Sequence, residues 1–268
     1  MTRLLFALLV ALATPALAQD TVLRGLVTGD DAAGWEAVGR IDIDGKGFCT
    51  GTLIAPDLVL TAAHCLFDKT TGARIAPERI AFLAGFRNGR ALAYRDVRVA
   101  LPHPDFVLRI PADPDEVRND LALLQLYQPV QIPSVTPFEL SQSRRPGTEV
   151  GVVSYGEGRE DVPSLQETCE VLGHEDGVLI MSCDADFGSS GAPVFRNENG
   201  VYRLVSVVSA MADLDGRKVS LGTDLAAPFA DLRAALAPGT GLFAAPPSQA
   251  RVLRPGETAD TGALFIRP

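Results

Sequence analysis

Residues 47–65 read GFCTGTLIAPDLVLTAAHC, and this stretch decides the fold class. Residues 48–53 and 58–61 are short runs of mainly apolar and β-branched residues, with Gly, Pro and Asp around them. Runs of this length and composition predict β-strands. Cys49 lies in the first run, while Cys65 follows the second run directly after His64.

Similar short runs continue along the chain on both sides of this stretch. They cover residues 38–43, 80–83, 93–99 and 121–126, and later 149–155, 178–182, 193–195, 204–210 and 218–221. Many short strands separated by turn residues predict an all-β sandwich or barrel. A Pro-rich bridge at residues 129–146 divides the runs into two sets of similar size, which suggests two barrels. One helix is predicted at residues 229–236, after Pro228 and before Pro238-Gly239.

The composition favours a packed protein that does not bind nucleic acid. Of the 268 residues, 47% are hydrophobic and 21% are charged, which argues against wholesale disorder. The net charge is −9, and no run of basic residues exceeds the pair Arg144-Arg145. A nucleic-acid-binding domain usually has the opposite balance.

The first 18 residues have the three parts of a signal peptide. Arg3 is followed by an apolar run at residues 4–13 and by the small-residue ending Ala16-Leu17-Ala18. The apolar run is far shorter than the roughly 20 residues that span a membrane. We therefore expect a secreted or periplasmic protein without a membrane anchor.

The chain has four cysteines, an even number that suits an oxidising compartment. Three pairings are possible, and the sequence-local one joins Cys49 to Cys65 and Cys169 to Cys183. Buried free thiols or a metal site are the alternatives. A zinc site is disfavoured because no CxxC motif occurs and the histidines, His64, His103 and His174, lie far apart.

Three segments carry residues suited to nucleophilic chemistry: residues 60–65 (LTAAHC), 119–124 (NDLALL) and 188–194 (GSSGAPV). A hydroxyl nucleophile needs a base that takes its proton and a carboxylate that orients the base. It also needs backbone N–H groups aimed at the developing oxyanion, which small residues in a sharp turn can supply. The three segments supply a His, an Asp and a Ser in such settings.

With these motifs in this order, residues 26–237 resemble the trypsin/chymotrypsin-like serine proteases, in their bacterial branch. GFCTGTLI at 47–54 and TAAHC at 61–65 are similar to the family's first disulfide and catalytic-His motif. NDLALL is similar to its catalytic-Asp motif, and GSSGAPV to its Gly-Asp-Ser-Gly-Gly-Pro-Val loop. The resemblance implies two antiparallel six-stranded β-barrels with a short C-terminal helix.

The resemblance also implies a role for each of the singled-out residues. His64 would be the general base, Asp120 the carboxylate that orients it, and Ser190 the nucleophile. The backbone N–H groups of Gly188 and Ser190 would form the oxyanion hole. Cys49 and Cys65 would form the bridge that clamps the loop of His64.

Ser189 departs from the family's pattern. Ser190, not Ser189, precedes Gly191 as the family's nucleophile does. Ser189 stands where trypsin-like zymogens keep the Asp that captures a newly freed N-terminal ammonium, although LVTG at 26–29 resembles a mature start. Bacterial glutamyl endopeptidases also lack this acid. However, the His that gives them their specificity has no counterpart in residues 205–210.

The expected specificity pocket contains Asp184, Ser209 and Met211. Asp184 lies six residues before Ser190, where trypsin-like enzymes place the carboxylate that selects Arg or Lys, and Asp186 is its rival. Ser209 also stands where the family keeps a Ser behind the triad. Bulky Met211 would narrow access for a long side chain.

The leading hypothesis is an exported serine endopeptidase that acts on protein or peptide substrates and needs no cofactor or metal. A catalytically silent homologue that serves as a binding module and an esterase on the same machinery are the alternatives. The sequence identifies no protein inhibitor. The predicted divisions are a signal peptide (1–18), an N-terminal segment (19–34), a first barrel (35–135), a second barrel with the helix (136–237), and a tail (238–268), either packed on the surface or partly disordered.

Overall fold

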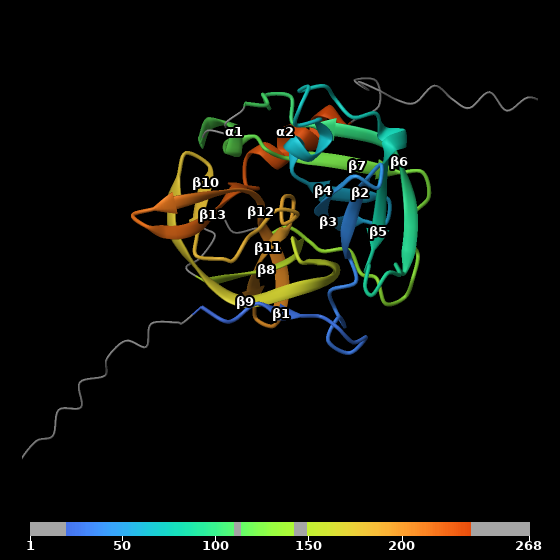
Figure 1. Cartoon of the computed structure of the whole chain (residues 1–268), viewed down its shortest axis with the longest axis horizontal. Coiled ribbons are helices and arrows are strands. Elements are labelled where there is room, and N and C mark those ends of the chain that lie inside the picture. The colour runs from blue at the N-terminus through green and yellow to red at the C-terminus, as the bar shows by residue number, and fades with distance from the viewer. Residues whose placement is uncertain (1–19, 110–113, 142–148, 237–268) are drawn as a thin grey trace, which may run out of the picture.

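Six antiparallel strands from the first half of the chain close into a barrel (Figure 1). The computed structural model describes residues 20–109, 114–141 and 149–236. The strands pair in the order β2-β3-β4-β7-β6-β5. Their bounds are β2 (Val38–Ile43), β3 (Gly47–Ala55), β4 (Leu58–Thr61), β5 (Ile80–Ala84), β6 (Ala93–Pro102) and β7 (Ala122–Leu126).

The second half forms a seven-stranded antiparallel sheet in the order β1-β9-β10-β13-β12-β11-β8. Strand β8 also pairs with β9, so six of these strands form a closed circuit to which β1 is added. The bounds are β1 (Arg24–Gly25), β8 (Glu149–Gly156), β9 (Arg159–Glu175), β10 (Val178–Met181), β11 (Pro193–Glu198), β12 (Val201–Leu214) and β13 (Arg217–Asp224).

The expected all-β architecture with a short C-terminal helix is confirmed. The predicted strand at 58–61 coincides with β4, and the predicted helix at 229–236 is α2 (Pro228–Ala235). Shorter helical segments, which the sequence analysis did not predict, occur as η1 (Ala63–Leu66), η2 (Pro77–Arg79) and α1 (Pro114–Arg118). The predicted signal peptide and the predicted tail at 238–268 lie outside the described residues. None of the helices described is long and apolar enough to cross a membrane.

Strand β9 is the main element that the sequence analysis missed. Its 17 residues carry charges at both ends and a proline at position 163, so they lack a steady apolar alternation. Gln166 is buried in its middle, where its side chain donates to the Thr21 carbonyl (3.0 Å) and accepts from the Asp184 N–H (2.7 Å). A buried polar side chain that binds backbone groups hides the pattern by which strands are recognised.

An aromatic cluster fills the seam between the barrels. Phe195 of β11 lies with its ring centroid 5.0 Å from that of Trp35 and 4.6 Å from that of Phe138, and Trp35 also contacts Tyr202 of β12. Phe138 belongs to the segment that connects the two barrels, and its N–H donates to Leu53 of β3. The cluster therefore joins residues from before, between and within the barrels.

We expect Phe195→Ala to lower the free energy of unfolding by about 3–5 kcal/mol, because the fully buried ring leaves a cavity in this seam. Urea unfolding measures the loss. The control is Phe187→Ala, since Phe187 is 64% exposed and its truncation should stay within about 0.5 kcal/mol of wild type. Equal losses in both variants would contradict the role given to the cluster.

Candidate active site

His64 is held at the mouth of the first barrel by its own short helix and by a disulfide. It lies in η1, directly after β4, and its neighbour Cys65 is bonded to Cys49 of β3. The ring Nδ1 lies 2.6 Å from Asp120 Oδ2, and the backbone N–H of His64 donates to Asp120 Oδ1 at 2.8 Å. Both bonds to one carboxylate fix the ring plane and the loop together.

Asp120 is 1% exposed and its carboxylate is surrounded by donors. Besides the two bonds from His64, it accepts one from the hydroxyl of Ser209 on β12. A carboxylate is an acceptor only, so Nδ1 of His64 carries the ring proton and Nε2 is left as the acceptor of the neutral imidazole. This is the tautomer that a general base requires.

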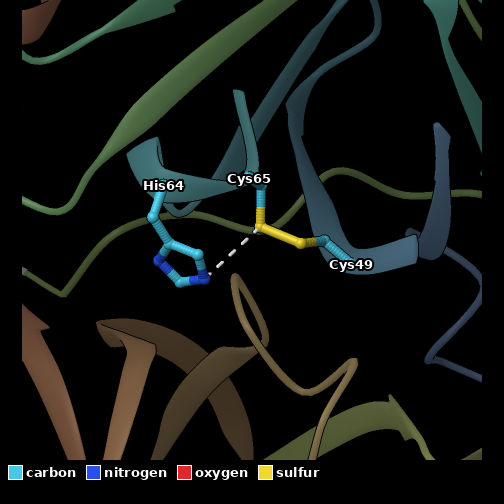
Figure 2. Close-up of side chains that lie close together, drawn as sticks. All are labelled: Cys49, His64 and Cys65. Carbon is cyan, nitrogen blue, oxygen red and sulfur yellow. Dashed lines mark hydrogen bonds between the residues drawn. A yellow bond between two sulfur atoms is a disulfide. The ribbon is translucent and has the colours of Figure 1, made fainter. Parts of the chain in front are cut away.

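Ser190 lies in the same cleft as His64. The cleft has two lobes of about 290 and 300 Å³, and His64, Lys69 and Ser190 line both. Within the described residues, the Ser190 hydroxyl makes no hydrogen bond, and His64 Nε2 lies 3.9 Å from Cys65 Sγ instead (Figure 2). Such contacts between a nucleophile and its base are often formed only when substrate is bound.

Ser189 uses all the hydrogen-bonding positions of its hydroxyl within the protein. It is 1% exposed, donates to the Tyr155 carbonyl and accepts from the Asp186 N–H and from Arg159 Nη2, each at 3.1 Å. A hydroxyl offers one donor and two acceptor positions, and all are occupied. Of the two adjacent serines, only Ser190 presents its hydroxyl to the cleft.

The turn of residues 186–190, here called the Ser190 turn, needs glycine at position 188. Gly188 has φ +94°, and a Cβ there would lie 2.1 Å from the Phe48 ring. The N–H groups of Gly188 and Ser190 donate to no acceptor among the described residues, so both are available to a ligand. This is the state that the predicted oxyanion hole requires.

Thr50 connects the Ser190 turn to the first barrel, and the sequence analysis missed it. Its N–H donates to the Ser190 carbonyl (2.8 Å) and its hydroxyl to the Gly188 carbonyl (2.9 Å). The Tyr155 N–H donates to the same hydroxyl at 3.0 Å. Its position beside Cys49 in the first barrel was the only signal in the sequence.

The residues expected in a specificity pocket are partly brought together. Ser209 and Met211 line the lobe of about 290 Å³, as does Asp186. Asp184 is exposed and is absent from the lining of that lobe, and its N–H donates to Gln166. Phe187 also lines this lobe and is largely exposed, so an aromatic ring is available there to a ligand.

The cysteines form two disulfides, Cys49–Cys65 and Cys169–Cys183, which confirms the sequence-local pairing. Cys49, His64 and Cys65 lie together, with ligand atoms within 4.8 Å of one another (Figure 2). Because both sulfurs belong to the disulfide, neither is a thiolate that could bind a metal ion.

Comparisons with known proteins identify the family of the chain. The family model of a trypsin-like peptidase domain matches residues 49–202. Serine protease 56 of Homo sapiens is 32% identical over 217 residues, which cover 69% of this chain and 34% of that protein. Mast cell protease 3 of Ovis aries is 31% identical over 175 residues, covering 62% and 64%. The chain therefore spans less than two thirds of the length of these relatives.

A solved structure has a similar fold. The structure of a Glu endopeptidase in complex with MPD superposes with a TM-score of 0.60 at 19% identity, over 75% of this chain and 90% of that chain. At this identity the likeness concerns the fold alone.

We expect Thr50→Val to lower the free energy of unfolding by about 1–3 kcal/mol, because it leaves the Gly188 carbonyl and the Tyr155 N–H without this partner. Thr52→Val is the matched control on the same strand. Thr52 is equally buried, yet its hydroxyl has no partner among the described residues, so its loss should be neutral or stabilising. Urea unfolding of both variants tests the bridge, and similar losses would contradict it.

Proposed function

The chain belongs to the trypsin-like peptidase family, and on that premise we propose that it is an exported serine endopeptidase. The observation that carries the proposal is the bonding of His64 to a buried Asp120, beside a Ser190 whose hydroxyl faces the same cleft. A base, its orienting carboxylate and a free hydroxyl are what acyl transfer by a serine needs.

The proposed reaction uses each of these groups in turn. Nε2 of His64 takes the proton of Ser190 Oγ as that oxygen attacks the scissile carbonyl carbon. The N–H groups of Gly188 and Ser190 receive the negative charge that develops on the carbonyl oxygen. His64 then gives its proton to the leaving amine, and water, activated by the same imidazole, hydrolyses the acyl-enzyme. None of these steps requires a cofactor.

The shape of the cleft supports cleavage within a chain. The two lobes meet at His64 and Ser190, so a bound peptide can extend in both directions from the reacting atoms. An esterase for small substrates would need only one lobe. The second lobe is lined by residues of the first barrel, both apolar ones such as Phe48 and charged ones such as Arg79, so it offers contacts to apolar and to charged side chains of a substrate.

Export is supported by the leader-like residues 1–18 and by the two disulfides. A secreted or periplasmic location follows from this proposal. Cell fractionation with N-terminal sequencing tests it. A mature chain that begins at Gln19 outside the cytoplasm supports export, whereas a chain that keeps residues 1–18 in the cytoplasm would contradict it.

We expect a fluorophosphonate probe to label the wild-type protein on Ser190, as located by mass spectrometry of the labelled peptide. Ser190→Ala should fold normally by circular dichroism and take up no label. Folded wild-type protein that takes up no label would favour a binding module. Labelling with hydrolysis of esters, but not of peptides blocked at both ends, would indicate an esterase.

Asp120→Asn should lower turnover by about 10⁴-fold with little change in the melting temperature, because the imidazole would be held in the wrong tautomer. Turnover of a blocked peptide and a thermal melt measure the two quantities. The exposed carboxylate of Asp30 offers a control, since Asp30 lies before the first barrel and lines neither lobe of the cleft, so Asp30→Asn should leave turnover unchanged. A loss of only severalfold in Asp120→Asn would mean that another group orients His64.

A further inference from the structure

Arg159, the first residue of β9, places its guanidinium behind the Ser190 turn. Nη1 donates to the Ser154 carbonyl, and Nη2 donates to Ser154 Oγ at 3.0 Å and to Ser189 Oγ at 3.1 Å. It forms no salt bridge with a carboxylate in the part of the chain that the structure describes. The partly buried guanidinium thus donates its hydrogen bonds to two hydroxyls and a carbonyl.

The surrounding chain makes room for this guanidinium. A Cβ at Gly156 would lie 2.6–2.8 Å from Nη2, Cζ and Nε of Arg159, so only glycine lets the guanidinium lie flat against the backbone. Burial lowers the pKa of Arg159, while the nearby carboxylates of Asp186 and Asp184 raise it. A guanidinium stays protonated in proteins, so Arg159 keeps its charge beside Asp184 and Asp186, which lie before and at the start of the Ser190 turn.

Ser189 transmits the effect of Arg159 to the turn. Arg159 occupies one acceptor position of the Ser189 hydroxyl and the Asp186 N–H occupies the other, while the hydroxyl donates to Tyr155. In addition, the Ser189 N–H donates to the Asp186 carbonyl at 2.9 Å. With every bond of Ser189 assigned, its neighbours Gly188 and Ser190 have little freedom to rotate their N–H groups.

We propose that Arg159 is a positioning residue, which acts through Ser189 to hold the Gly188 and Ser190 N–H groups toward the substrate carbonyl. The proposal rests on the proposed peptidase function. It assigns the support of the turn to the side chain of the first residue of β9. The bonds of Arg159 to Ser154 of β8 anchor this support in the second barrel.

The proposal implies that the turn forms without a cut before Leu26. The chain ahead of Leu26 is already part of the second barrel. Thr21 and Thr168 exchange backbone and side-chain hydrogen bonds, and the Leu26 N–H donates to the Pro163 carbonyl. Leu26 itself is fully buried. The active protein should therefore retain residues 20–25, so the intact mass of probe-labelled protein should include them.

The test compares Arg159→Gln with Arg203→Gln, which removes a cation from β12 that pairs with Glu139 and Glu198 away from the turn. Arg159→Gln should lower kcat for a blocked peptide by roughly 10- to 100-fold with little change in KM, since misplaced N–H groups affect the transition state. Arg203→Gln should match wild type. The double variant Arg159→Gln/Ser189→Ala should have a kcat no lower than that of the less active single variant. Both substitutions remove the same hydrogen bond between Arg159 and Ser189, so their effects should not add.

Hydrogen–deuterium exchange provides a readout that needs no activity. In Arg159→Gln, exchange should rise in the peptide that covers the Ser190 turn and remain unchanged in β12 and β13. Wild-type kcat together with unchanged exchange in the turn would overturn the proposal, and so would a rise in exchange throughout the second barrel. If wild-type protein takes up no fluorophosphonate, the proposed function fails, and the exchange data still decide whether Arg159 holds the turn.

Labelled protein found only as chains that begin at Leu26 would overturn the implication for the N-terminal segment. Labelled chains that retain residues 20–25 would support it.

Discussion

The pair Cys49-Thr50 on β3 is the constraint on which the rest of the site depends. Through its disulfide, Cys49 holds the helical turn of His64, and through two hydrogen bonds Thr50 holds the carbonyls of Ser190 and Gly188. Two adjacent residues of one strand thus set the spacing between His64 and Ser190, which are 126 positions apart in the chain. Because both residues are buried, water competes little for these bonds.

The candidate site also depends on how the barrels meet. His64 and Asp120 come from the first barrel, while Ser190 and the Ser209 hydroxyl that binds Asp120 come from the second. The aromatic cluster around Phe195 and the bonds of Thr50 are formed across the same boundary. Rotation of one barrel against the other would break the Ser209–Asp120 bond and part the two lobes of the cleft. The geometry of the candidate site therefore depends on the packing between the two barrels.

The strands and the helix could be predicted from sequence where a short apolar run or flanking turn residues marked them, as in β2, β4 and α2. The prediction failed at β9, where the buried side chain of Gln166 hydrogen-bonds to backbone groups and charged residues occupy both ends of the strand. The residues expected to be catalytic could be singled out because motifs of a known family carry them. The contacts of Arg159 and the exposure of Asp184 could not be predicted from the sequence. Both depend on which side chains the folded strands bring next to a turn. Contacts between β8, β9 and the Ser190 turn leave no local pattern in the chain.

The pairing of residues 20–26 with β9 also affects the order in which the protein can be assembled. The Thr21 hydroxyl donates to the Thr168 carbonyl, 147 positions later in the chain. On a ribosome, this opening segment emerges long before its partner strand exists, whereas the strands of the first barrel find all their partners within residues 38–126. Closing so long a loop is entropically costly and is rewarded only once β9 is in place. Residues 20–26 are thus synthesised before the rest of the domain but are among the last to pair. Until they pair, the edge of β9 that they cover has unpaired backbone groups.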